Sequence, residues 1–97
     1  MLAVVNHPTV HRVEVSGWDQ DQIFFVENSL LEWTLGFGKR LTLARALPPG
    51  AVVFLRLVQP ISSERCRPVP YATELLKTTG QGRREFLLHA IAPHPTK

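Results

Sequence analysis

The sequence predicts an all-β fold, a small antiparallel barrel of six to seven strands, and three observations lead to it. Short stretches rich in β-branched and aromatic residues alternate apolar and polar positions. Glycine, proline, asparagine and aspartate clusters separate these stretches every eight to twelve residues or so. No segment carries a sustained helical periodicity. The 97 residues, 44% hydrophobic and 20% charged, are the size and composition of one globular domain.

Each expected strand follows from its local pattern. The first alternates cleanly, with Val13 and Val15 on one face. In the strand after the Pro-Pro-Gly turn, Val53, Leu55 and Leu57 face the core because Arg56 marks the opposite side. In chain order, strands are expected at residues 12–17, 22–28, 30–35, 38–45, 51–59, 70–79 and 83–91. Turns are expected between them at residues 17–21, 28–29, 36–38, 48–50 and 80–82.

The remaining segments are expected to be irregular. Residues 1–10 form an extended lead-in, because Pro8 argues against a helix there, and this segment can add an edge strand. Residues 60–70 hold three prolines and form the longest loop. The tail 92–97 is expected to be flexible. A short helix over residues 71–77 is the alternative to the sixth strand.

The composition indicates which cellular compartment and which classes of partner to expect. Cys66 is the only cysteine, which favours a reducing compartment. No run approaches the roughly 18 apolar residues of a membrane span, and residues 1–6 lack the charge and cleavage site of a signal peptide. We therefore expect a cytoplasmic protein without membrane insertion. The net charge of +3 is mild, and its cations are dispersed.

The stretch from Leu30 to Leu43 is the best candidate for a ligand site. Gly36 and Gly38 let the backbone approach a ligand closely, and Lys39 and Arg40 add two adjacent cations. This pattern favours a small anionic ligand.

The order of these features resembles the PilZ domain over about residues 10–91. Gly17, Asp19, Phe25 and Glu27 fit the family's first motif, a glycine–aspartate turn followed by a strand. The later strand pair fits at Gly38, Leu41, Leu43, Leu47, Gly50, Val53, Leu55 and Leu57. The resemblance implies a small β-barrel that binds the bacterial second messenger cyclic di-GMP.

Both ligand motifs of that family are eroded here. Histidines His7 and His11 keep the spacing of the arginine motif, with Arg12 beside them, but neutral histidine lacks the permanent charge and donor fork of arginine. Two lost charge-assisted contacts at about 1.5–3 kcal/mol each move a micromolar site towards the millimolar range. In the second motif, Glu32 stands for the acid and Thr34 for the serine. The last glycine of the motif is displaced to Gly38 or replaced by Phe37. The bulky side chain of Trp33 flanks the turn. The resulting candidate ligand residues are His7, His11, Arg12, Glu32, Trp33, Thr34, Gly36, Gly38, Lys39 and Arg40.

The sequence therefore predicts a degenerate member of the family. We expect a non-enzymatic regulatory or adaptor domain in bacterial signalling that binds cyclic di-GMP weakly or not at all and has no other cofactor. Trp18 and Phe37, both expected in turns, form the predicted interaction surface at one end of the barrel. Edge strands of so small a barrel could also pair between two copies, which leaves a homodimer open.

A nucleic-acid-binding barrel is the alternative, with Lys39, Arg40, Arg83 and Arg84 as its basic surface. Steep salt dependence of binding would favour it over an apolar protein interface.

Metal binding and catalysis find little support in the pattern. His7 and His11 are four residues apart but lie in an extended segment, and His89 and His94 have no acid or cysteine at ligand spacing. Cys66 lies between two arginines, which favours a reactive thiol, but no base is placed to make it a catalytic nucleophile.

Overall fold

Six strands and no helix make up the part of the chain that the structure describes. The computed structural model describes residues 9–58 and 67–91. The strands are β1 (Thr9–Trp18), β2 (Phe24–Thr34), β3 (Gly38–Leu43), β4 (Val52–Leu57), β5 (Val69–Thr78) and β6 (Arg84–Ala90). The expected all-β class is confirmed.

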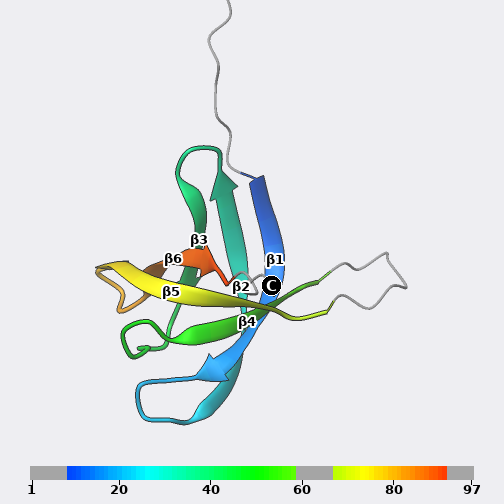
Figure 1. Ribbon diagram of the computed structural model, residues 1–97. Helices are drawn as coiled ribbons and strands as arrows, with labels where there is room; N and C mark the ends of the chain where they lie inside the picture. Colours follow the sequence, from blue (N-terminus) through cyan, green and yellow to red (C-terminus); the bar gives the residue numbers. More distant parts are fainter. Residues whose placement is uncertain (1–8, 59–66, 92–97) are drawn as a thin grey trace, which may run out of the picture.

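The strands close into an antiparallel barrel in the order β1-β2-β3-β6-β5-β4, with β4 paired back to β1. In Figure 1, β1, β2 and β3 run roughly lengthwise on one side, and β4, β5 and β6 cross them steeply on the other. Each strand therefore pairs with a neighbour on both sides over at least part of its length. Closure removes the unpaired edges that dimerisation by edge pairing requires, so the structure does not support that route to a homodimer.

The core fills the inside of this barrel with alternate apolar residues from β1, β2, β3, β4 and β6. Val53 and Leu55 are buried as expected, but Leu57 is 39% exposed because the β1–β4 ladder ends at the Val13–Leu57 pair. Leu47 and Tyr71 pack against the core from its periphery. The buried apolar side chains are Val13, Val15, Phe25, Leu31, Leu41, Leu43, Val53, Leu55, Phe86 and Leu88.

The expected break at residues 28–29 is wrong, because β2 runs through it without interruption. All of β1 pairs with residues 24–33 of β2, so ten consecutive cross-strand pairs outweigh the local turn preference of Asn28-Ser29. The polar side chains are accommodated without a turn. Asn28 is exposed, and the Ser29 hydroxyl donates a hydrogen bond to the Thr42 carbonyl at 2.6 Å. Two expected strands are therefore one.

Other boundaries shift by a few residues. β1 already begins at Thr9, so the end of the expected lead-in belongs to the barrel, and its hairpin turn starts at Asp19 rather than at Gly17. β3 ends at Leu43 instead of residue 45. Residues 71–77 lie within β5, so the helical alternative is wrong. Residues 1–8, most of the expected loop and the expected flexible tail 92–97 lie outside the described residues.

Candidate functional site

The β2–β3 turn has the glycine-dependent backbone that its sequence predicts. Gly36 and Gly38 adopt φ values of 89° and 80°, the left-handed region that glycine enters without steric cost. The Phe37 amide donates a hydrogen bond to the Thr34 carbonyl at 2.9 Å, and Thr34 itself is buried. The tip of this turn is apolar. Leu35 is 71% exposed and Phe37 67%.

The predicted ligand residues beside this turn divide between two faces. Glu32 pairs across the strands with Arg40, and their side chains lie on the outside of the barrel. Trp33 pairs with Lys39 on the inward side, at the open end, where the Lys39 ammonium lies 5.4 Å from the centroid of the Tyr71 ring. Consecutive residues of a strand point to opposite faces, so Lys39 and Arg40 cannot act as one basic pair.

The outward residues line a groove of about 490 Å³ that runs across β2, β3 and β6. A neighbouring depression of about 320 Å³ between β1 and β2 shares Asn28, Ser29 and Leu30 with it and adds Arg12. Of the predicted set, the structure therefore brings Arg12, Glu32 and Arg40 together on one surface. The residues lining the larger groove are Val10, Asn28, Ser29, Leu30, Glu32, Arg40, Thr42, Arg83 and Glu85.

Sequence reasoning missed several of these lining residues. Asn28 and Leu30 were assigned to a break and a following strand, and their outward positions follow only from the continuous β2 ladder. Arg83 comes from the β5–β6 turn, fifty-one residues after Glu32 along the chain, and only the β3–β6 pairing brings it near. Spacing along the sequence carries no signal for such a contact.

Carboxylates already engage the guanidinium groups of this groove. Arg40 Nη2 donates to Glu32 Oε1 at 3.1 Å, and Arg83 Nη2 lies 3.9 Å from Glu27 Oε2. Arg40 Nε is buried and has no hydrogen-bond partner among the described residues. An anionic ligand in this groove would meet two partly neutralised cations and no exposed free donor at Arg40 Nε, which is a weak basis for phosphate binding.

The arginine-motif positions contribute little to this surface. His11 is exposed opposite Leu31, at the end of the barrel that holds the β2–β3 turn. Arg12 accepts a backbone hydrogen bond from Val58 at 3.0 Å through its carbonyl. His7 lies outside the described residues. Across residues 9–58 and 67–91 no group of three metal-ligating side chains occurs, and His89 Nε2 lies 2.8 Å from Glu74 Oε1.

Trp18 and Phe37 lie at opposite ends of the barrel, so they do not form the single predicted surface. Trp18 ends β1 and pairs with Phe24 at the start of β2, whereas Phe37 follows the end of β2. The first and last of the eleven residues of β2 lie roughly 33 Å apart, at about 3.3 Å for each step along the strand. Because β2 spans the whole barrel, one aromatic cluster lies near each of its ends.

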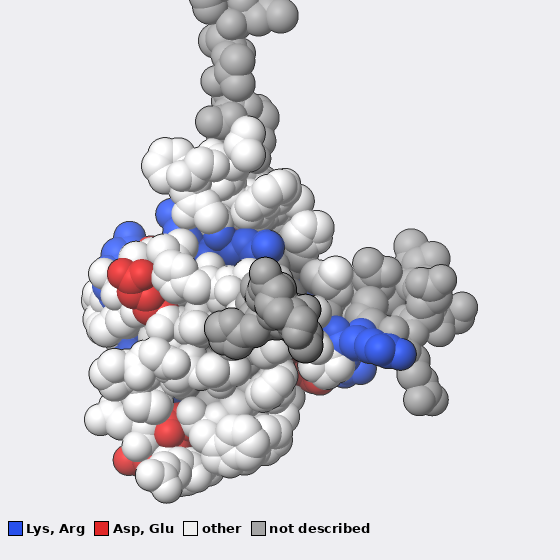
Figure 2. Space-filling view, in the orientation of Figure 1, with Lys and Arg blue, Asp and Glu red and all other residues white. Residues whose placement is uncertain are grey.

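The four cations of the alternative nucleic-acid surface do not form one cluster, because only Arg40 and Arg83 line the same groove. Lys39 lies over Tyr71, and Arg40 is paired with Glu32. Arg84 donates hydrogen bonds to the carbonyls of Ala44 and Gly82. In Figure 2 the lysine and arginine atoms on this face form separate groups, not one continuous patch. The arrangement lacks the continuous basic track that a nucleic-acid backbone requires.

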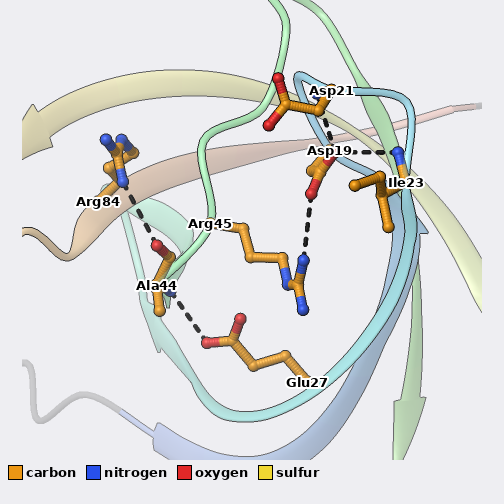
Figure 3. A network of polar contacts seen from close by, with 7 residues as sticks. All are labelled: Asp19, Asp21, Ile23, Glu27, Ala44, Arg45 and Arg84. Carbon is orange, nitrogen blue, oxygen red and sulfur yellow. Dashed lines mark hydrogen bonds and ion pairs between the residues drawn. The ribbon is translucent and has the colours of Figure 1, made fainter.

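A polar network supports the β1–β2 turn beside the groove, and Figure 3 shows its contacts. Asp19 Oδ1 accepts hydrogen bonds from the amides of Ile23 and Asp21, and Asp19 Oδ2 accepts one from Arg45 at 3.1 Å. The Ile23 and Asp21 amides and the Arg45 guanidinium together hold the pKa of Asp19 below its usual value, although burial opposes this shift. The Asp19 carboxylate therefore organises a hairpin, and all its contacts are internal.

The comparisons with known proteins add no family. No family model, curated protein or solved structure matches the chain. Within the described residues, no helix is long and apolar enough to cross a membrane.

Proposed function

We propose that this chain is a non-enzymatic, PilZ-like adaptor of bacterial signalling that works in the cytoplasm through protein–protein contacts. It binds cyclic di-GMP weakly or not at all. The observation that carries the proposal is the Glu32–Arg40 ion pair, because it engages the one arginine of the predicted ligand set that lines the larger groove.

The arrangement of the candidate residues supports weak ligand binding. A cyclic dinucleotide carries two phosphates, which bind best to unpaired arginine forks. Here Lys39 faces the inward side and Arg40 is held by Glu32, so Arg12 is the one outward-facing cation without a carboxylate partner among the described residues of the predicted set. The surface therefore offers a dinucleotide phosphate less attraction than a pair of unpaired arginines would.

Exposed apolar side chains support a role in protein contacts. Leu35 and Phe37 project at the end that holds the β2–β3 turn, and Trp18 and Phe24 are about half exposed at the other end. Clustered exposed aromatic residues mark interaction surfaces more often than isolated ones do. Two such clusters at opposite ends suit an adaptor that contacts more than one surface.

Isothermal titration calorimetry with cyclic di-GMP, at low and moderate salt, tests the ligand half of the proposal. We expect no measurable heat at ligand concentrations in the high micromolar range. Micromolar binding that is lost in the double variant Trp33→Ala/Arg40→Ala would contradict the proposal and make the chain a second-messenger receptor. Binding that survives this variant would contradict it too, with a site elsewhere.

A restored arginine motif tests the family resemblance separately. The double variant His7→Arg/His11→Arg returns two permanent charges at the family spacing, and we expect it to gain at least roughly tenfold in affinity for cyclic di-GMP. The matched control is His89→Arg with His94→Arg, which adds the same charge away from the motif. Equal binding by the two variants would show only a general charge effect and would count against the resemblance.

A further inference from the structure

The outer face of β4, β1 and β2 carries a continuous apolar surface near the β1–β2 turn. The cross-strand pairs Trp18–Phe24, Ser16–Val26 and Ser16–Phe54 place these side chains on one face. Val52 lies on the same outward side, because its neighbour Val53 pairs with buried Gly17. We call this surface the outer apolar face: Trp18, Phe24, Val26, Val52 and Phe54 around Ser16.

The outer apolar face is held in place before any partner binds. The rings of Trp18 and Phe24 meet edge to face, with their centroids 5.2 Å apart. Their backbones belong to the β1–β2 ladder, and Gly17, which precedes Trp18, pairs with Val53 of β4. Ordering such side chains on binding costs little entropy, which favours association.

The size of this face suits a weak dimer. Trp18 and Phe24 are 54% and 53% exposed, so each offers on the order of 100 Å², and the aliphatic members bring the total to about 400 Å² per copy. Two copies would bury about 800 Å² of apolar surface in this contact, and a polar rim would add to it. A total buried area of this size is typical of weak, transient interfaces.

Charge and shape make this face suitable for a second copy of itself. The face holds no ionisable side chain, and the next row of residues carries the Glu14–Arg56 ion pair, in which both charges are already matched at 2.9 Å. Two copies therefore meet with no like charges facing each other within the contact, although each chain carries a net charge of +3. Ser16 is small and lies between the projecting aromatic rings and the branched side chains. A two-fold axis through Ser16 lets the outer apolar faces of the two copies pack against each other.

We propose that two copies of this chain associate through the outer apolar face, packed sheet on sheet about a two-fold axis near Ser16. The inference rests on the proposed function, because it names a partner for one of the two apolar clusters. The calorimetric test with cyclic di-GMP is independent of this inference. If the protein is a monomer that does not bind cyclic di-GMP, a second copy is excluded as the partner, and the adaptor proposal stands.

Sedimentation velocity over a range from about 10 μM to about 1 mM tests the dimer, since this range brackets a weak interface. We expect a monomer–dimer equilibrium in the wild-type protein. Val26→Lys adds a charge to the face directly opposite Ser16, and we expect it to raise the dimer dissociation constant at least roughly tenfold. Leu30→Lys is the matched control, because Leu30 is also 55% exposed on the outward side of β2 but lies four residues beyond Val26.

The two lysine variants decide the result. Loss of the dimer in Val26→Lys alone supports the proposal, provided that circular dichroism and thermal unfolding show both variants folded. A second variant, Phe24→Lys, replaces Val26→Lys if that protein does not fold. A wild-type monomer at every concentration, or equal loss in Leu30→Lys, would overturn the proposal. A dimer that persists in both Val26→Lys and Phe24→Lys would place the interface elsewhere and overturn it as well.

Discussion

Arg40 shows how one contact changes the chemistry of a predicted site. Its side chain faces outward into the groove, as that of a ligand-binding arginine must. However, Glu32, directly opposite on β2, accepts a hydrogen bond from Nη2 of its guanidinium group. Both side chains remain partly exposed, so this ion pair adds only about 0–1 kcal/mol to stability. Its larger effect is to reduce the attraction that the groove offers to an anion.

The ionisation of Asp19 couples the fold to pH. Its pKa is lowered from an ordinary value of 3.8, first by the Ile23 amide and then by the Asp21 amide and Arg45, so its charged form favours the folded state. The stabilisation is present above about pH 4 and is lost as the pH falls through the lowered pKa. We expect Asp19→Asn to unfold at a lower temperature than wild type at pH 7, with the difference shrinking towards pH 2.

Thermal unfolding followed by circular dichroism across this pH range measures the effect. Asp21→Asn is the control, because the Asp21 carboxylate is exposed and makes no hydrogen bond or ion pair with the described residues. A difference between wild type and Asp19→Asn that does not change with pH would show that the carboxylate acts only through its shape.

At the scale of elements, the β2–β3 hairpin depends on a glycine that also packs closely. Gly38 has a φ of 80°, and a Cβ atom there would lie 3.3 Å from Leu87 Cδ1. We expect Gly38→Ala to reduce the free energy of unfolding by about 1–2 kcal/mol, through backbone strain and the need for Leu87 to move. Urea titration gives the value.

Gly80, in the β5–β6 turn, supplies the comparison. It has no atom within 4 Å of a Cβ position and no left-handed φ. We expect Gly80→Ala to change the free energy of unfolding by less than about 0.5 kcal/mol, or to raise it slightly. Equal losses in the two variants would show that loss of glycine flexibility, and not the geometry of the β2–β3 turn, sets the effect.

At the scale of the whole molecule, closure of the barrel makes stability depend on a small core. Leu43 on β3 is fully buried where β3 meets β6, whereas Leu35 at the turn tip is 71% exposed. We expect Leu43→Ala to cost about 2–5 kcal/mol, a large share of the 5–15 kcal/mol of a typical domain, and Leu35→Ala to cost less than about 0.5 kcal/mol. Urea unfolding of the two variants measures the difference, and a similar cost for both would mean that the turn tip is packed in solution.

The fold class and much of the core could be predicted from the sequence, because both follow from local rules. Alternation fixes which side chains of a strand share a face, so Val13, Val15, Val53 and Leu55 were assignable to the core without any knowledge of strand partners. Gly36 and Gly38 likewise predicted the turn between β2 and β3, and the structure adds that both have a positive φ. These properties depend on residues within a few positions of one another.

Only the tertiary structure decided how the strands combine and what the candidate site contains. Pairing along the whole of β1 makes β2 one continuous strand where the sequence predicts two. Trp18 and Phe37 therefore lie at opposite ends of the barrel. Pairing of β3 with β6 brought Arg83 to the groove. Strand partners and registers depend on the sum of many long-range contacts, which no single stretch encodes. The sequence by itself therefore determined the all-β class and much of its interior, and the closed barrel decided which surface residues meet.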